Sequence, residues 1–439
     1  MIKRLQTNYN SFEIFSIFKN EKDSFILDSS MHFKDLGRYS IIGFNPFKTI
    51  KLKDYENTFD KLEEELNRYK VINKTNLPFI GGAVGYISYD SYQYVENIKE
   101  SAIDDINGYD IYFGFYDIAI VIDHLEDEKY IVTPNLDTKN EYNKVIEVEQ
   151  KILNSVVEKR ELIECKETKL TSNFTKEEFE NAVLKVKEYI KSGDIYQVNL
   201  TQRFSGKTNI DSFDLYEKLR KISPSTFSAF LNFEGYNVLS NSPERFIKVI
   251  DNNIETRPIK GTRPRGIDEK HDLELIEELK NSEKDKSELL MIVDLERNDL
   301  SKICDKVEVP SLFEIESYAN VHHLVSSVCG EINEDISIKE ILKATFPGGS
   351  ITGAPKIRAM EIIEELEGIK RNVYTGSIGY ISFCSNMDFN IAIRTLIKKN
   401  DEFYFQVGGA VTWDSNPSEE YQETLDKAKS IIGALNGKL

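Results

Sequence analysis

The sequence predicts an α+β fold made mostly of antiparallel sheet. Strand-like runs dominate, and the long stretch VYTGSIGYISFCSNMDFNIAIRTLIKKNDEFYFQVGGAVTW has polar turns at SNMD and KKND, which is typical of a meander. Helical patterns flank these runs at about 268–284, 355–367 and 418–434. With 439 residues, 40% of them hydrophobic, the chain can form two or three domains or one large intertwined unit.

Along the chain, the predicted elements fall into two regions. Residues 1–150 combine short strands such as IAIVIDHL and KYIVT with one helical stretch, TFDKLEEELNRYK. Residues 151–172 are charged and poor in apolar side chains, so we assign them to a linker. The second region is then 173–439.

The second region begins with a well-marked helix, TKEEFENAVLKVKEYIKSGD. Thr175 and Glu178 fit a capping box, apolar residues recur every three or four positions, and Gly193 ends the helix. Further on, YNVLSNSPERFIKVIDNNIETRPIKG alternates apolar and polar residues around an Asp-Asn-Asn turn, which predicts a hairpin.

Charge and cysteine usage exclude several classes of function. The chain has 74 Asp+Glu against 56 Lys+Arg, so nucleic acid and anionic membranes would be repelled. The four cysteines form no CxxC pair, which argues against zinc knuckles and disulfides. With no signal-peptide h-region and no run of 18 apolar residues, we expect a soluble cytoplasmic protein. Basic spots such as RPIKGTRPR at 257–265 then favour a small anionic ligand.

Three glutamates are candidate metal ligands. Glu420 and Glu423 lie three residues apart, so both carboxylates share one helix face and could hold Mg²⁺. Acidic residues in a first helical turn also simply complement the helix dipole, and spacing alone favours that reading. Glu288, on another predicted helix, could supply a third carboxylate if the helices meet.

The loop FPGGSITGAPKIRAMEII places Gly348, Gly349 and Gly353 before a helix that starts near Pro355. Such a turn can offer backbone N–H groups to a carboxylate, or it can be a tight packing turn. No GK[ST] follows, so the loop is not a Walker A nucleotide site.

Two further positions suggest anion binding. Arg394 ends a strand predicted to be buried, and its partner is either a protein carboxylate or a ligand. His322 and His323 are adjacent and point in different directions, so they cannot form a paired metal site, and one of them can face a pocket.

Lys260, in PIKGT, is a candidate nucleophile. It would have to be neutral, and the nearby Arg257, Arg263 and Arg265 would help by lowering its pKa. A charged lysine on the rim of a site is the simpler interpretation of this residue taken alone.

Taken in order, the motifs GDIYQVNLTQRF, SPERF, TRPIKGTRPRG, ELLMIVDLERNDL, HHLVSSV, FPGGSITGAPKIRAMEI, YTGSIGY, NIAIRT and DSNPSEEYQETLDKA resemble the chorismate-utilising enzymes. This family includes anthranilate synthase component I, aminodeoxychorismate synthase component I, and the isochorismate and salicylate synthases. The resemblance is dense over about 175–435 and thinner in the N-terminal region. It implies an anthranilate synthase component I-like fold, with two β-sheet layers (a β-sandwich), peripheral helices and a chorismate-binding catalytic domain at 173–439.

Three positions indicate the branch. Gln197 stands where the water-using isochorismate synthases have a lysine base, so ammonia is the implied nucleophile. Anthranilate synthases usually read PIAGT where this chain reads PIKGT, and lysine there is the mark of aminodeoxychorismate synthase. The segment SPSTFSAFL, with Thr226, differs from the NPSPYM of the tryptophan feedback site, so the resemblance argues against such feedback.

The resemblance also assigns roles. Lys260 would attack C2 of chorismate while the C4 hydroxyl leaves with help from Glu244 as general acid, and ammonia would then enter at C4 and expel the lysine. Mg²⁺ would be bound by Glu288, Glu420 and Glu423. The implied substrate-binding residues are Gln197, Thr262, His323, Tyr374, Arg394, Gly409 and Ala410. The family often has glycine at the last of these positions, so its backbone geometry is an open question.

The sequence contains no amidotransferase signature such as GxCxG, so the implied ammonia source is a separate glutaminase subunit. Anthranilate synthase component I is the nearest alternative, and an isochorismate synthase is disfavoured by Gln197. A non-catalytic chorismate-binding homologue is the alternative from another class, although the carboxylates and Lys260 are intact.

Overall fold

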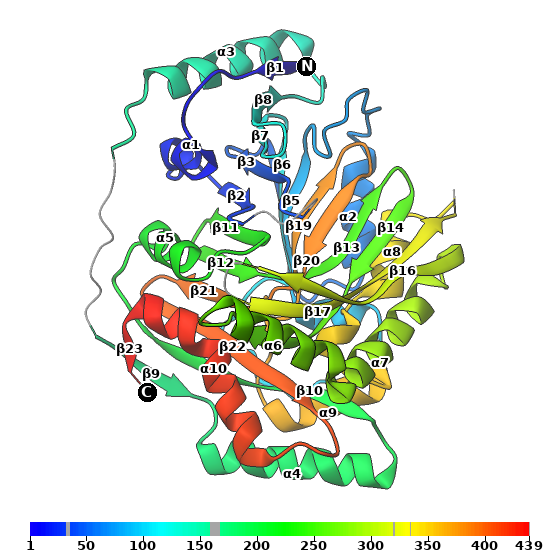
Figure 1. Ribbon diagram of the computed structural model, residues 1–439. Helices are drawn as coiled ribbons and strands as arrows, with labels where there is room; N and C mark the ends of the chain where they lie inside the picture. Colours follow the sequence, from blue (N-terminus) through cyan, green and yellow to red (C-terminus); the bar gives the residue numbers. More distant parts are fainter. Residues whose placement is uncertain (32–35, 159–166, 319–320, 334, 439) are drawn as a thin grey trace.

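The computed structural model describes residues 1–31, 36–158, 167–318, 321–333 and 335–438. Two large, mostly antiparallel sheets pack face to face, and helices cover their outer faces (Figure 1). Aromatic side chains, among them Phe25, Tyr86 and Tyr112, fill the space between the sheets. The predicted α+β class and the two-layer arrangement are therefore confirmed.

The first sheet extends across the whole molecule. Its strands follow the order β1 (Ile2–Arg4), β8 (Glu128–Val132), β7 (Ala119–Asp123), β3 (Tyr39–Gly43), β2 (Ser24–Asp28), β11 (Phe227–Phe233), β12 (Tyr236–Ser242), β21 (Thr395–Lys399), β22 (Glu402–Val411), β10 (Gln197–Lys207), β9 (Thr168–Ser172) and β23 (Gly437–Lys438), and β18 (Gly353–Ala354) also pairs with β10.

The second sheet is smaller. Its strands follow the order β15 (Ile259–Pro264), β17 (Val321–Ile332), β14 (Asn253–Arg257), β13 (Arg245–Ile250), β20 (Met387–Asn390), β19 (Ser377–Ser382), β5 (Gly82–Ile87), β6 (Ile111–Tyr116) and β4 (Lys48–Leu52), and β16 (Cys304–Ser317) pairs with β17.

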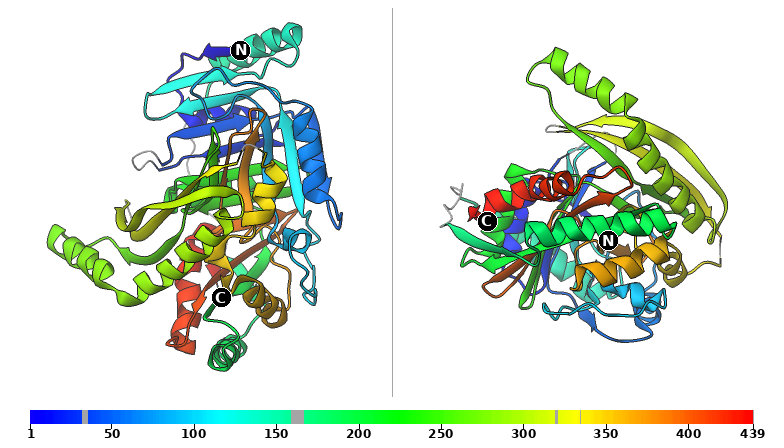
Figure 2. Two further views of the ribbon diagram at one scale, coloured as in Figure 1. Left: turned by 90° about the vertical axis from the view of Figure 1, so that its right-hand side faces the viewer. Right: turned by 90° about the horizontal axis from the view of Figure 1, so that it is seen from below.

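The helices pack in groups on the sheets (Figure 2). Against the first sheet lie α1 (Ser11–Phe18), α3 (Thr138–Asn154), α5 (Ser212–Ile222) and α10 (Pro417–Leu435). Against the second lie α2 (Thr58–Asn67), α7 (Glu283–Leu300) and α8 (Ile338–Thr345), with α6 (Glu269–Asn281) along β15 and β17. The β10 end is covered by α4 (Lys176–Ser192) and α9 (Lys356–Glu367), and η1 (Tyr89–Tyr94) and η2 (Gly349–Ile351) are short 3₁₀ turns.

The two regions read from the sequence share both sheets. Strand β2 pairs with β11, and β5 pairs with β19, so each sheet joins chain from either side of the predicted linker. The predicted linker, 151–172, is only partly irregular. Helix α3 extends to Asn154, and residues 159–166 lie outside the described residues. Residues 168–172 form β9, in which Thr168 and Leu170 are buried and Lys169 between them is exposed. The chain length allowed either two or three domains or one intertwined unit, and the structure is one intertwined unit.

Most local predictions are confirmed. Thr175 and Glu178 form the predicted capping box of α4, and Gly193 ends the helix at φ 85°. Strands β13 and β14 form the hairpin around the Asp-Asn-Asn turn, and β21 and β22 form the one at KKND.

One element differs from the prediction. The segment Ile391–Arg394 is not a strand, because the chain crosses there from β20 in the second sheet to β21 in the first. Arg394 has a φ of 50°, in the left-handed region, as this crossing requires.

Candidate active site

Two crossings between the sheets bring predicted site residues together. Glu244 lies where the chain passes from β12 in the first sheet to β13 in the second, and Arg394 lies in the return crossing from β20 to β21. The crossings are bonded to each other: the Ile391 N–H donates to the Glu244 carbonyl (3.0 Å), and the Ser242 hydroxyl donates to the Ile391 carbonyl (2.6 Å). These hydrogen bonds hold the crossing that contains Glu244 beside the crossing that contains Arg394.

Lys260 projects from β15 toward the glycine-rich loop. Its Nζ donates to the carbonyl oxygen of Ser350, in η2, over 3.0 Å. The pairing of β15 with β17 shifts between Lys260 and Thr262, so Gly261 forms a bulge at φ 70°. A Cβ on Gly261 would lie 2.7 Å from Leu279 Cδ1, so glycine is required to place Lys260 here.

The Glu244 carboxyl lies beside Lys260. It is buried, and the Ile259 N–H donates to its Oε1 over 3.4 Å. Burial raises the pKa of Glu244, which the Ser350 hydroxyl and the charge of Lys260 partly oppose. Among the described residues, the buried Ser350 hydroxyl has no hydrogen-bond partner of normal geometry. A carboxyl of raised pKa next to an amine is suited to general-acid work.

The pKa of Lys260 is lowered, but not by the predicted cause. Burial of the ammonium group lowers it first, opposed by the carboxylates of Glu288 and Glu244, and Lys427 is the cation that adds to the lowering. The three flanking arginines are neutralised by acidic partners: Arg257 by Glu316, Arg263 by Glu278 and Asp285, and Arg265 by Asp272. The prediction that these arginines lower the pKa of Lys260 is therefore wrong.

The three candidate metal ligands converge from two helices. Glu423 on α10 is close enough to Glu288 on α7 for its charge to raise the pKa of Glu288, and it raises the pKa of Glu420 in the same way. Burial raises the pKa of Glu288 and of Glu420. Burial alone would raise the pKa of Glu423, but the charges of Lys427 (2.7 Å away), Lys284 and Lys260 together outweigh it, so the pKa is lowered.

This carboxylate set suits a hard divalent cation. Gly409 on β22 lies against two of these carboxylates and leaves space beside them. A Cβ at this position would lie 3.1 Å from Glu423 Oε1 and 3.3 Å from Glu420 Oε2. In the part of the chain that the structure describes, no three carboxylate, histidine or cysteine side chains are close enough to form a metal-binding cluster, so the Mg²⁺ site remains a prediction.

Arg394 has no acidic partner among the described residues. Burial lowers the pKa of its guanidinium, and no ion pair compensates. Of the two alternatives that the sequence left open, the protein ion pair is therefore absent and an anionic ligand is favoured.

The adjacent histidines have different surroundings. His323 faces Arg394 and shares a 2.9 Å hydrogen bond with the Thr262 hydroxyl through Nδ1. Burial, followed by the charge of Arg394, lowers the pKa of His323 to about 3, so it is a neutral ring at physiological pH. His322 is fully buried between Ser317 (2.8 Å) and Asp272 (3.0 Å) and packs away from the site.

The remaining predicted residues are Tyr374, Gln197, Gly409 and Ala410. Tyr374 is buried in the turn whose Thr375 N–H donates to the Ala392 carbonyl (2.8 Å), next to the Arg394 crossing. Gln197 is buried at the start of β10, and its Oε1 has no hydrogen-bond partner among the described residues. Gly409 and Ala410 pair with β10 on one edge, while the described pairing with β21 stops at Phe405. Ala410 lies in regular extended backbone, so alanine fits without strain.

Sequence reasoning missed three residues of this site. Ser350 touches both Lys260 and Glu244, Lys427 binds Glu423 and the Gly408 carbonyl (2.9 Å), and Lys284 lies 3.9 Å from Glu288. The position of Lys427 four residues after Glu423 on one helix could have suggested that pair.

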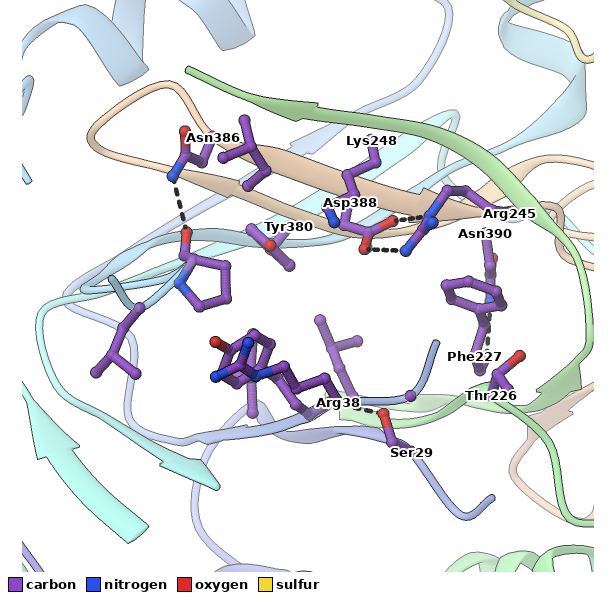
Figure 3. Close-up of a pocket in the computed structure, with 18 of the residues that line it drawn as sticks. Ser29, Arg38, Thr226, Phe227, Arg245, Lys248, Tyr380, Asn386, Asp388 and Asn390 are labelled. Carbon is purple, nitrogen blue, oxygen red and sulfur yellow. Dashed lines mark hydrogen bonds and ion pairs between the residues drawn. The ribbon is translucent and has the colours of Figure 1, made fainter. Parts of the chain in front are cut away.

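A separate cavity of about 590 Å³ lies between the sheets and shares none of the predicted site residues (Figure 3). Thr226 and Phe227 of the SPSTFSAFL segment line it, facing Arg38 and Tyr380. Arg245 at its wall is bonded to Asp388 and to Glu255. The absence of tryptophan feedback, expected from the sequence, remains a prediction for this cavity.

No helix in the described ranges is long and apolar enough to cross a membrane. Cys304, Cys329 and Cys384 are free thiols, and Cys165 lies outside the described residues.

With this geometry in place, known proteins give a consistent comparison. Residues 22–433 match the family model described as chorismate binding enzyme. The chain is 39% identical to aminodeoxychorismate synthase component 1 of Bacillus subtilis, over 91% of this chain and 89% of that protein. It is 37% identical to anthranilate synthase component 1 of Aquifex aeolicus, over 99% and 96%. The crystal structure of anthranilate synthase component I from Streptococcus pneumoniae superposes with a TM-score of 0.82 at 33% identity, covering 91% of this chain and 93% of that one.

The fold and site define a chorismate-utilising enzyme, and the chain belongs to the chorismate-binding enzyme family. Its relatives divide between the aminodeoxychorismate and anthranilate synthases, so membership alone does not select the product.

Proposed function

We propose that this chain is aminodeoxychorismate synthase component I, which converts chorismate and ammonia to 4-amino-4-deoxychorismate for p-aminobenzoate and folate synthesis. The observation that carries the proposal is the placement of Lys260: an amine of lowered pKa, held by the Ser350 carbonyl beside the buried Glu244 carboxyl. A lysine that only binds an anionic substrate would do so best as a charged ammonium group, whereas a nucleophilic lysine must first lose a proton.

In the first step, the neutral amine of Lys260 forms a bond to C2 of the ring. Both ring double bonds shift, from C1=C2 to C1=C6 and from C5=C6 to C4=C5, and the C4–O bond breaks. Glu244 gives its proton to the departing hydroxyl, which leaves as water. The new ammonium on Lys260 returns a proton to Glu244.

In the second step, ammonia bonds to C4, both double bonds shift back to C1=C2 and C5=C6, and the C2–N bond to Lys260 breaks. The ammonium formed at C4 loses one proton. The nitrogen of Lys260 takes up one proton and leaves as a neutral amine. The net change exchanges hydroxyl for amino at C4, with water released.

Other residues would bind and orient the substrate. Arg394, which has no acidic partner among the described residues, would pair with a chorismate carboxylate, and His323 and Thr262 would hold the ring nearby. Glu288, Glu420 and Glu423 would hold Mg²⁺, which would supply positive charge against the substrate's carboxylates. Ammonia would come from a separate glutaminase subunit, or from ammonium salts in vitro.

The test is incubation of the purified chain with chorismate, Mg²⁺ and ammonium, with products identified by NMR and by anthranilate fluorescence. The proposal expects 4-amino-4-deoxychorismate without anthranilate. Mass alone would not serve, because the two amino products are isomers.

Anthranilate synthase component I is the second candidate, favoured by the match over 99% of this chain to the Aquifex aeolicus protein. In that case ammonia would attack C2 directly, anthranilate would be the main product, and Lys260 would be a binding residue. Chorismate binding without any product would instead identify a non-catalytic homologue.

A further inference from the structure

A buried carboxyl that the mechanism does not use lies directly behind the glycine-rich loop. Glu296 belongs to α7 and is only 8% exposed. Its one hydrogen bond comes from the Thr256 hydroxyl, which donates to Oε2 over 3.0 Å. No cation pairs with it among the described residues, because the nearby Lys356 is bonded to Asp299 and to the Thr345 and Pro347 carbonyls.

Glu296 supports the turn that contacts both reactive groups. A Cβ added to Gly349 would lie 2.9 Å from Leu295 Cδ2 and 3.6 Å from Glu296 Cγ, so these α7 side chains press against the turn. The next residue, Ser350, accepts the hydrogen bond from Lys260 and adjoins Glu244. A shift at Glu296 would therefore reach the reactive groups through Gly349 and Ser350.

A small cavity separates Glu296 from the turn. It has a volume of about 10 Å³, and its walls include Thr256, Glu296, Thr345, Gly348 and Gly349. This volume matches one water molecule, and the hydroxyls and backbone groups around it can supply the two to four polar partners that a buried water needs.

We propose that Glu296 is a positioning residue: a neutral carboxylic acid that braces the Gly348–Gly349 turn through one buried water and so fixes Ser350 against Lys260 and Glu244. The inference rests on the proposed function, because it takes those two residues as the reacting groups. Ionisation of Glu296 would remove its O–H donor and place a charge behind the turn, which would release Ser350.

The charges around Glu296 agree with a neutral acid. Burial, followed by the carboxylates of Glu244 and Asp299, raises the pKa of Glu296 to about 8. The Thr256 hydroxyl and the charge of Lys356 oppose this only in part. The acid is thus protonated at neutral pH and ionises in the mildly alkaline range.

The experiment compares the wild-type chain with E296Q, which keeps a neutral side chain of the same shape at every pH. Chorismate consumption is measured from pH 6 to 9.5 with Mg²⁺ present and free ammonia held constant. At pH 9 about a tenth of a group with this pKa stays protonated. We therefore expect about a tenfold alkaline decline in the wild type that E296Q lacks. D294N, on the exposed side of α7, is the matched control and should follow the wild type.

Unfolding in urea gives a second readout that needs no activity. Because the folded pKa of Glu296 exceeds the ordinary 4.5, its stabilising effect is complete below that value and is lost as pH rises to about 8. E296Q should therefore lose less stability than the wild type between pH 5 and 9. If E296Q does not fold, T256V, which removes an opposing hydroxyl, should move the alkaline decline to higher pH.

The outcomes separate this inference from the proposed function. Identical pH profiles and stability curves for the wild type and E296Q would overturn the role of Glu296, whichever product forms. A wild type that consumes no chorismate at any pH would sink the proposed function, and the stability curves would still decide whether Glu296 is a neutral acid.

Discussion

The ammonium nitrogen of Lys260 and the carbonyl oxygen of Ser350 lie 3.0 Å apart, which joins an edge strand of the second sheet to the glycine-rich loop. A carbonyl accepts a hydrogen bond from an amine in either protonation state, so this contact aims Lys260 without requiring its charge. The same residue, Ser350, adjoins Glu244, and one loop thus aligns the proposed nucleophile and the proposed acid.

The first prediction concerns the product made without Lys260. K260A should form 4-amino-4-deoxychorismate roughly 10³-fold more slowly or worse, the scale of loss when a nucleophile is removed. Any residual amination should occur at C2, because ammonia can then reach that carbon directly. Product analysis by NMR and fluorescence measures both, and K260A that kept the wild-type rate and product would rule out a covalent role for Lys260.

The second prediction concerns the protonation of Lys260. Burial lowers its pKa from the ordinary 10.5, so its amine should react with an acylating reagent at lower pH than a surface lysine does. Peptide mass spectrometry over a pH series gives the midpoint, with the exposed Lys270 as the internal control. E288Q removes a carboxylate that raises the pKa of Lys260 and should lower the midpoint further. Equal midpoints for both lysines would contradict the prediction.

The third prediction contrasts two arginines. Arg394 has no acidic partner in the described structure, so R394Q should leave the melting temperature unchanged or higher. Its KM for chorismate should rise about 10²-fold, since losing a charged contact to a ligand costs roughly 2–5 kcal/mol.

R371Q is the matched comparison for R394Q. Arg371 is fully buried and bonded twice to Glu367, at 2.6 and 2.8 Å, so breaking that pair should cost roughly 3–5 kcal/mol of stability. If R394Q were the less stable of the two variants, Arg394 would be a structural residue.

The fourth prediction concerns a buried aspartate next to the Tyr374 turn. Asp90 accepts the Asn372 N–H over 2.8 Å, and burial raises its pKa from 3.8 to about 7. A raised pKa means that the folded state holds the proton more tightly than the unfolded state does. The free energy of unfolding therefore declines as the pH rises from 3.8 to about 7. The decline attributable to Asp90 is up to about 4 kcal/mol.

D90N keeps an acceptor for the Asn372 N–H and cannot ionise. It should therefore match the wild type at pH 4 and exceed it in unfolding free energy at pH 8, as measured by urea denaturation. A difference between the two proteins that does not change with pH would exclude titration of Asp90.

The sequence was sufficient for the class of fold and for several local elements. Capping at Thr175 and turns at Asp-Asn-Asn and KKND are local signals, and the structure has each of them. Sequence patterns could not predict which residues far apart in the chain come into contact. The spacing of Glu420 and Glu423 says nothing of Glu288, and the pairing of Arg263 with Glu278 and Asp285 depends on how α6 and α7 pack on β15.

The crossing at Arg394 shows a second limit. NIAIRT has the composition of a buried strand, and Ile391 and Ala392 are indeed buried although the segment is a crossing. Only the assignment of β20 and β21 to different sheets explains why the segment leaves the strand there. Periodicity reports burial, and it does not report which sheet a strand joins.

The last prediction concerns the metal. Gly409 has no positive φ, so alanine is allowed by the backbone, yet its Cβ would lie 3.1 Å from one Glu423 oxygen and 3.3 Å from one Glu420 oxygen. G409A should therefore push the two carboxylates apart and weaken Mg²⁺ binding, measured by calorimetric titration, by about tenfold or more, which corresponds to roughly 1.4 kcal/mol. G433A, on α10 where an added Cβ meets no atom within 4 Å, should bind as the wild type does. Unchanged Mg²⁺ affinity in G409A, with both variants melting near the wild type, would place the metal away from Glu420 and Glu423.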